Sequence, residues 1–208
     1  MTTLYIIRHG ETTGNDAGQF QGSTDCELSE RGFAQIERLG ERCRELPFEA
    51  LISSPLIRAR ETASAANRYH GLPLRIEPDL AEMHCGEWEQ KSWDELRCEY
   101  PEEMELWREK PWLFCSPGGE TMRGVYDRVT GVIQRIVQEH QGKTVALVSH
   151  GCAIRNALCF FHGKDIEHLN EMPWVRNTSI TRVDISEDGA MQVVFENDFE
   201  HVRDIVKL

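Results

Sequence analysis

The sequence predicts an α/β fold, a three-layer sandwich in which a mostly parallel sheet carries helices on both faces. Short apolar runs at residues 4–7, 50–53 and 144–149 have the length and composition of buried strands. Amphipathic helical patterns lie between them. Strands that alternate with helices pair in parallel through right-handed crossovers, so this order favours a sheet covered on both faces.

The expected helices are marked by start and stop signals. The first begins at Ser29, whose hydroxyl can cap it, and ends at Pro47. Leu28 is placed to pack against Phe33 just inside this helix. Its buried face is predicted to consist of Phe33, Ile36, Leu39, Cys43 and Leu46. Further helices are expected from 55 to about 69, from about 120 to 139 with Val125, Val129, Val132, Ile133 and Ile136 on one side, and after Gly151.

The stretch from 85 to 119 departs from this alternation. It is acidic, is broken at Pro101 and Pro111, and holds four of the five tryptophans: Trp88, Trp93, Trp107 and Trp112. We expect short helices that form a cap inserted in a single domain spanning residues 1–208. Trp88 and Trp112 are expected to line the site in preference to facing a partner protein.

The C-terminal part is expected to complete the sheet. Residues 179–185 and 191–195 are predicted to be two strands joined by a turn at 187–189. One of them is expected to run antiparallel at the sheet edge.

Composition excludes several classes of function. The net charge of −12 would repel nucleic acid and anionic lipid, so neither is an expected partner. No apolar run reaches the roughly 18 residues that span a bilayer, and the N-terminus carries no export signal. Seven cysteines without C-x-x-C spacing argue against a disulfide framework and favour a cytoplasmic location. The sequence leaves the oligomeric state open, with a homodimer among the alternatives.

Charged and nucleophilic side chains follow three of the predicted strands. Arg8 and His9 come after the first strand, Arg58 lies one helical turn after the second, and His150 follows a later one. Ligands of open α/β sheets bind at the carboxyl ends of strands. Two guanidinium groups and two imidazoles suit a tetrahedral dianion, and the helix after Gly151 should add its positive N-terminal end. Each residue alone also fits a structural role, an ion pair for Arg58 or a core histidine for His150.

Six blocks in order resemble the histidine phosphatase superfamily, the phosphoglycerate mutase-like proteins. They are LYIIRHGET at 4–12 with Asn15, LSERG at 28–32, SSPLIRARETA at 53–63, LAE at 80–82 with GEWE at 86–89, PGGET at 117–121, and VSHG at 148–151. The resemblance covers nearly the whole chain. It is greatest to the small bacterial broad-specificity, phosphoserine and α-ribazole phosphatases, which the sequence does not separate.

The resemblance implies roles for these residues. His9 would be the nucleophile, and Glu82 the proton donor. Arg8, Arg58 and His150 would hold the transferring phosphoryl group. Further phosphate-binding residues are expected to be Asn15, Gln21, Gly22 and Gly151, although Gln21 and Gly22 fit plain loop positions equally well. The implied activity is hydrolysis of a small phosphorylated metabolite through phosphohistidine, with no metal and no cofactor.

Two alternatives stay open. A cofactor-dependent phosphoglycerate mutase would be longer, with extra inserted segments, and a non-catalytic phospho-ligand sensor would not need His9, Glu82 and His150 intact.

Four positions depart from the family pattern or admit a structural explanation. Gly14 precedes the loop asparagine where the family often has Trp, and Gln90 stands where Gly commonly follows the Trp-Glu pair. These departures put substrate specificity in doubt more than chemistry. Asn177 resembles a family position, but turn formation explains it at least as well, and Glu120 is explained as an acid at a helix start.

Overall fold

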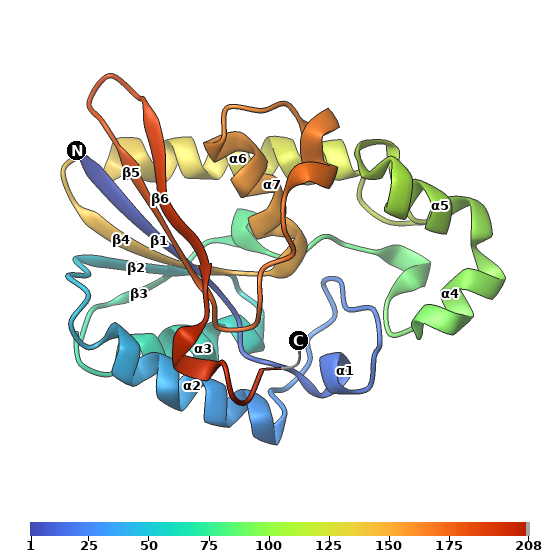
Figure 1. Ribbon diagram of the computed structural model, residues 1–208, viewed down its shortest axis with the longest axis horizontal. Helices are drawn as coiled ribbons and strands as arrows, with labels where there is room; N and C mark the ends of the chain where they lie inside the picture. Colours follow the sequence, from blue (N-terminus) through green and yellow to red (C-terminus); the bar gives the residue numbers. More distant parts are fainter. Residues whose placement is uncertain (207–208) are drawn as a thin grey trace.

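Residues 1–206, which the computed structural model describes, form a six-stranded mixed sheet of order β3-β2-β4-β1-β5-β6 (Figure 1). β4 pairs in parallel with β1 on one side and with β2 on the other. The strands are β1 (Thr2–Arg8), β2 (Ala50–Ser53), β3 (Leu74–Ile76), β4 (Thr144–Ser149), β5 (Ile180–Ile185) and β6 (Met191–Asp198). The register sets Arg8 opposite Ser149 and Ser53 opposite Val148, so three carboxyl ends meet at one edge.

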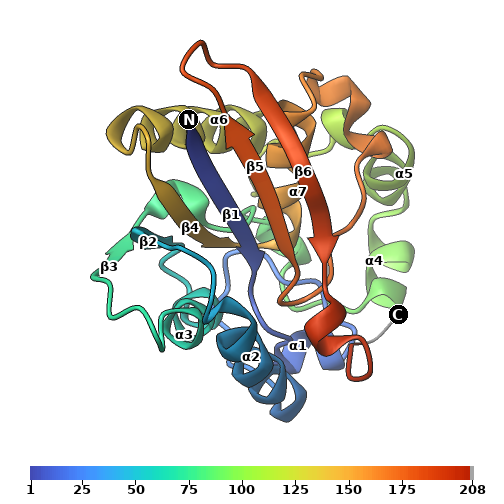
Figure 2. The same cartoon turned by 60° about the vertical axis from the view of Figure 1, so that its left-hand side comes forward.

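Helices cover both faces of this sheet, as Figures 1 and 2 show. Alternate residues of β1 point to opposite faces. Leu4 and Ile6 pack with α6 (Met122–Glu139) and α7 (Gly151–Phe161). Tyr5 and Ile7 pack with α2 (Glu30–Cys43) and α3 (Ile57–Ala66). The predicted three-layer α/β sandwich is therefore confirmed, and so is the buried side of α6: Val125, Val129, Val132, Ile133 and Ile136.

The C-terminal strands confirm the expected antiparallel edge strand. This strand is β6, which lies at the sheet edge and is antiparallel to β5. β5 lies inside the sheet and is antiparallel to β1. The opposite edge strand, β3, was not predicted, because it is three residues long and its two apolar side chains, Leu74 and Ile76, are exposed.

Helix α2 begins as predicted and buries the predicted Ile36, Leu39 and Cys43, but not Phe33. The Ser29 hydroxyl accepts a hydrogen bond from the Gly32 N–H at 3.0 Å. Phe33 was expected in the core and is 49 % exposed, so that prediction is wrong. The reason is Gly32: a Cβ at this position would lie 1.9 Å from the Glu11 carbonyl oxygen. The glycine face packs against that backbone, and Leu28 packs with Ile36 in place of Phe33.

The same helix ends before Pro47. Regular α-helix stops at Cys43, and the N–H groups of Arg44 and Leu46 each bond a carbonyl three residues earlier. This tighter winding is typical of a final helical turn. The proline therefore follows the helix end by several residues and does not set it.

The cap contains two short helices, α4 (Trp93–Glu99) and α5 (Pro101–Glu109), set apart from the sheet (Figure 1). Pro101 opens α5, and Pro111 opens a 3₁₀ turn at 111–113, the position where proline is best tolerated. Trp88 is fully buried with Trp107 and Phe114 around it, so it forms the cap's own core and neither lines the site nor faces a partner.

The backbone conformation of Gln90 shows why glycine is common at this position of the family pattern. Its φ is 67°, the left-handed region that glycine adopts most easily. A side chain in this region costs about 1–2 kcal/mol. The Gln90 N–H donates to the Phe20 carbonyl at 2.9 Å, so this turn ties the cap to the loop before it.

Within residues 1–206, no helix combines the length and apolar character that crossing a membrane requires.

Candidate active site

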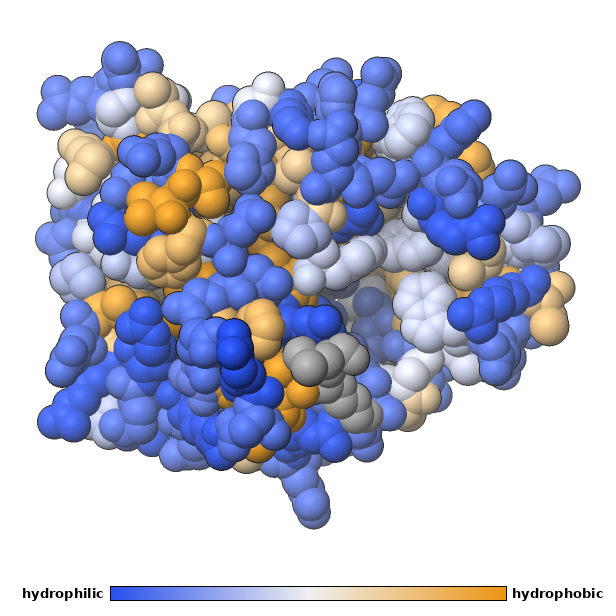
Figure 3. Space-filling model, viewed as in Figure 1, coloured by the Kyte–Doolittle hydropathy of each residue, from blue (hydrophilic) through white to orange (hydrophobic). Residues whose placement is uncertain are grey.

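The predicted site residues converge where β1, β2 and β4 end. The His9 N–H donates to the Ser149 carbonyl and the Ser54 N–H to the Val148 carbonyl, each at 3.0 Å. The residues beyond these strands line a cavity of about 350 Å³. Its wall includes seven of the predicted residues: Arg8, His9, Asn15, Gln21, Arg58, Glu82 and Gly151. Figure 3 shows a hollow between the body of the molecule and the cap.

His9 is buried, and its hydrogen bond fixes its tautomer. Its Nδ1 lies 2.7 Å from the Gly10 carbonyl oxygen, which can only accept a hydrogen bond. Burial, and then the charges of Arg58 and Arg8, hold the pKa of His9 well below its ordinary value. The ring is therefore neutral at pH 7, with the proton on Nδ1 and the lone pair on Nε2.

The two arginines bring positive charge to the cavity from two elements, Arg8 from the end of β1 and Arg58 from α3. Arg8 donates through Nη1 to the Val175 carbonyl, and its buried Nε has no hydrogen-bond partner among the described residues. Burial lowers the pKa of Arg8 to about 10, so it stays a cation at neutral pH. Arg58 donates through Nη1 to the Thr24 carbonyl and through Nη2 to the Gly22 carbonyl, each at 2.8 Å.

His150 lies behind the cavity wall, in contact with Arg58. The Arg58 Nε–H donates to His150 Nδ1 at 3.2 Å, so the proton of the neutral ring is on Nε2. That Nε2–H donates to the Ser54 hydroxyl at 2.6 Å. The ring centroids of His9 and His150 are 5.1 Å apart. Direct contact between His150 and a phosphoryl group would require exchange of the Ser54 hydrogen bond.

Glu82 accepts three hydrogen bonds from backbone N–H groups. Its Oε1 accepts from Met83 at 3.0 Å and Ala153 at 3.1 Å, and its Oε2 accepts from Cys152 at 3.0 Å. Cys152 and Ala153 open α7, so the positive end of this helix faces the Glu82 carboxylate. Glu82 therefore takes up the N–H groups of the second and third residues of α7, while Gly151, the first residue of this helix, lines the cavity.

Asn15 and Gln21 shape the loop side of the cavity. Asn15 and Thr12 form a capping box on the short helix α1 (Thr13–Asp16), in which Asn15 Oδ1 accepts from the Thr12 N–H at 3.2 Å. The Gln21 amide bonds the Thr12 hydroxyl at 2.8 Å. A Cβ on Gly14 would lie 1.9 Å from that amide, so Gln21 fills the space of the missing side chain.

Sequence reasoning expected tryptophans at the site but named Trp88 and Trp112, which are not among the residues that line the cavity, and it missed several supporting residues. Phe20, Trp93, Trp107 and Trp174 line the cavity. Trp174 lies outside the cap, and Arg155, one helical turn after Gly151, stacks its guanidinium 4.6 Å from the Trp174 ring. Nothing in the local sequence marks Trp174. Ser54 lies in a recognised block, but its bond to His150 was not foreseen, and Asn177 donates to the His9 carbonyl at 3.0 Å.

Among the described residues, no group of three or more His, Cys, Asp or Glu side chains is placed to hold a metal ion.

The two site histidines predict a loss of stability in mild acid. Burial is the main cause that keeps the pKa values of His9 and His150 low, so both stay neutral when folded, whereas unfolded histidines bind protons below about pH 6.5. The unfolded state then holds more protons, and stability falls as the pH falls. From pH 6.5 to 5 the free energy of unfolding should drop by roughly 3 kcal/mol for the pair.

Urea unfolding across this pH range measures the loss. A His9→Ala protein should show a weaker pH dependence, because it lacks one of the histidines that burial keeps neutral in the folded state. His168, whose side chain is 53 % exposed, provides a control, since His168→Ala should leave the dependence unchanged. A stability independent of pH between 7 and 5 would contradict the neutral, buried state of both rings.

Comparison with known proteins matches this chain to a family. The model of the histidine phosphatase superfamily (branch 1) matches residues 4–198. Phosphoserine phosphatase 1 of Hydrogenobacter thermophilus is 32 % identical over 166 residues, which are 80 % of this chain and 79 % of that protein.

Solved structures agree. YhfR of Bacillus stearothermophilus is 33 % identical, with a TM-score of 0.92 over 98 % of this chain and 100 % of that one. The α-ribazole phosphatase of Shigella flexneri is 26 % identical, with a TM-score of 0.86 over 95 % of this chain and 96 % of that one. The resemblance seen in the sequence is thereby confirmed: this chain belongs to the histidine phosphatase superfamily, branch 1.

Proposed function

We propose that this protein hydrolyses a small phosphorylated metabolite through a phosphohistidine on His9, without a metal ion or cofactor. The observation that carries the proposal is the state of His9. It is neutral, with its Nδ1 proton committed to Gly10 and its Nε2 lone pair free, and it lines one cavity with Arg8 and Arg58. A nucleophile beside two cations is the arrangement that phosphoryl transfer needs.

In the first step, His9 Nε2 attacks phosphorus as the bond to the leaving oxygen breaks. Arg8 and Arg58 neutralise the oxygens of the transferring group, and the unpartnered Arg8 Nε is a donor that such an oxygen satisfies. Glu82 gives a proton to the departing alkoxide. The phosphorylated ring gains positive charge, which the Nδ1–H bond to the Gly10 carbonyl stabilises.

In the second step, water attacks the phosphohistidine and inorganic phosphate leaves. The Glu82 carboxylate, now ionised, accepts a proton from the water. In this proposal His150 sets the orientation of the Arg58 guanidinium through its Nδ1 and holds the phosphoryl group when its Nε2 leaves Ser54. Asn15, Gln21 and Gly151 complete the pocket, and Gly22 holds Arg58 through its carbonyl.

The leaving group would lie against the aromatic wall. Trp93 and Trp107 of the cap and Trp174 of the body offer apolar surface to the part of the substrate beyond the phosphate. Relatives named as phosphoserine and α-ribazole phosphatases support a small phosphomonoester as substrate. A cytoplasmic location fits the seven cysteines, all free thiols within the described residues.

The proposal predicts turnover without added metal. After treatment with EDTA, the protein should hydrolyse p-nitrophenyl phosphate at a rate within about twofold of the untreated rate, because arginines neutralise the phosphoryl oxygens. Strict dependence on restored Mg²⁺ or Zn²⁺ would contradict it. A phospho-ligand sensor on this scaffold would instead bind inorganic phosphate without hydrolysing the ester.

A further inference from the structure

The segment that carries Glu82 lacks regular secondary structure between the 3₁₀ turns at 78–80 and 86–88, yet a cation holds its backbone. Arg128 of α6 donates through Nη1 to the Asp79 carbonyl at 2.9 Å and to the Ala81 carbonyl at 2.8 Å. One guanidinium nitrogen thus donates to two backbone carbonyls in the segment directly before Glu82.

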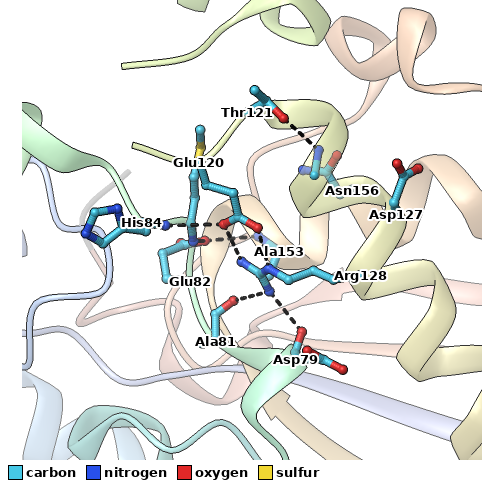
Figure 4. Close-up of polar contacts among 12 residues, drawn as sticks. Asp79, Ala81, Glu82, His84, Glu120, Thr121, Asp127, Arg128, Ala153 and Asn156 are labelled. Carbon is cyan, nitrogen blue, oxygen red and sulfur yellow. Dashed lines mark hydrogen bonds and ion pairs between the residues drawn. The ribbon is translucent and has the colours of Figure 1, made fainter. Parts of the chain in front are cut away.

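Glu120 joins Arg128 in a two-pronged ion pair, drawn in Figure 4. Arg128 Nε lies 2.7 Å from Oε1, and Nη2 lies 3.0 Å from Oε2. The two side chains are only 19 % and 24 % exposed, and paired forks of this kind are stronger and more directional than single contacts.

Glu120 also holds the chain after Glu82. Its backbone N–H donates to the His84 carbonyl at 2.7 Å, and its carboxylate accepts from the His84 N–H at 3.4 Å. The backbone is therefore hydrogen-bonded on both sides of Glu82, at Ala81 to Arg128 and at His84 to Glu120. Ser149, at the end of β4, adds a third hold through a 2.7 Å bond from its hydroxyl to the Leu80 carbonyl.

This support matters for the direction of the Glu82 carboxylate. Its three N–H donors come from Met83 and from the start of α7, so the carboxylate meets them only if its own backbone keeps its place. A proton donor must also lie within hydrogen-bond reach of the leaving oxygen, and a displacement of about 1 Å can cost about 10²-fold in rate.

We infer that Arg128 and Glu120 are positioning residues that hold Glu82 in place for proton transfer, acting through the backbone of residues 79–84. The inference rests on the proposed role of Glu82. It assigns the ion pair a function in turnover beyond that of a helix-start acid with a surface partner.

The test compares two esters with similar rings but different leaving groups. Benzyl phosphate releases an alkoxide that needs a proton, whereas p-nitrophenyl phosphate releases a stable phenolate. In single turnover, Arg128→Met should slow benzyl phosphate cleavage by about 30- to 100-fold and p-nitrophenyl phosphate cleavage by less than about threefold. Equal losses on the two esters would overturn the inference.

Arg135→Met is the matched control. Arg135 lies on the same helix, with its side chain 46 % exposed, and pairs with the Glu77 and Asp79 carboxylates at 2.8 and 3.5 Å. Arg135 contacts side chains of the same segment, whereas Arg128 donates to its backbone at the Ala81 carbonyl. Its removal should change neither rate by more than about twofold. A leaving-group contrast in this variant equal to that of Arg128→Met would overturn the specific role of Arg128.

A double variant separates this inference from the proposed function. If Arg128 acts through Glu82, adding Arg128→Met to Glu82→Gln should cause no further loss on benzyl phosphate, and multiplied losses would overturn the inference. If Glu82→Gln loses more rate on benzyl phosphate than on p-nitrophenyl phosphate and Arg128→Met does not, the positioning role alone is refuted. No contrast in Glu82→Gln would refute the acid role, and with it the inference.

Milder variants serve if Arg128→Met does not fold. Arg128→Lys keeps the charge but loses the fork, and Glu120→Gln keeps the size but loses the ion pair. Both should show the same contrast, reduced to about three- to tenfold, and no contrast in either folded variant would overturn the inference.

Discussion

A His9→Ala protein is expected to lose at least about 10⁴-fold in kcat on p-nitrophenyl phosphate, because among the described residues that line the cavity only His9 offers a neutral nitrogen lone pair beside Arg8 and Arg58. The wild-type protein, quenched with denaturant during turnover, should carry phosphate in a bond that is labile to acid and stable to alkali. The variant should carry none.

The control for this prediction is an exposed histidine. His168→Ala should retain wild-type turnover and phosphoprotein formation, and circular dichroism should show that both variants keep the fold. Turnover of His9→Ala at the wild-type rate would remove His9 as the nucleophile, whatever the roles of the other residues.

Substitution of Glu82 is expected to depend on the leaving group. Glu82→Gln should lower benzyl phosphate cleavage by about 10²- to 10⁴-fold, which is roughly 3 to 5 kcal/mol of barrier, because an alkoxide leaves poorly without a proton. On p-nitrophenyl phosphate the first step should keep much more of its rate. Phosphoenzyme should then accumulate, since the same carboxylate serves as base in the second step.

The structure adds an expectation for the stability of this variant. A glutamine has one acceptor oxygen where the carboxylate has two, and its amide group would face N–H donors of Met83, Cys152 or Ala153. The unmet hydrogen bond should cost about 1–3 kcal/mol of the free energy of unfolding. Glu87→Gln, at an exposed neighbouring position, is the control, and equal fractional losses on both esters would leave Glu82 with a structural role only.

The central sheet was predictable because its signal is local. The runs at 4–7 in β1, 50–52 in β2 and 145–148 in β4 are apolar, as expected for parallel strands covered on both faces, and the family blocks follow the strand ends in order. The exposure of Phe33 on α2 was not predictable from hydrophobic spacing. It depends on contact between Gly32 and the Glu11 backbone, which lies in another part of the chain.

The sequence was enough to predict which residues meet in the candidate site, but not which hydrogen-bond partners each of them has. Strand ends brought His9, Arg8 and Arg58 to one cavity, as parallel topology requires. The partners of each group depend on side-chain directions that a single sequence does not encode. The Ser54 bond to His150 and the use of the α7 N-terminus by Glu82 are of this kind. The catalytic roles themselves stay predictions until the variants are measured.

The contact between Gly14 and Gln21 couples two positions of the cavity wall. Because the Gln21 amide occupies the volume that any side chain at position 14 would need, the two positions share one space. A library intended to change the substrate range should therefore randomise both codons together. A side chain introduced at position 14 alone would displace the Gln21 amide from its hydrogen bond with the Thr12 hydroxyl, so its effect on selectivity would be mixed with that of the moved glutamine.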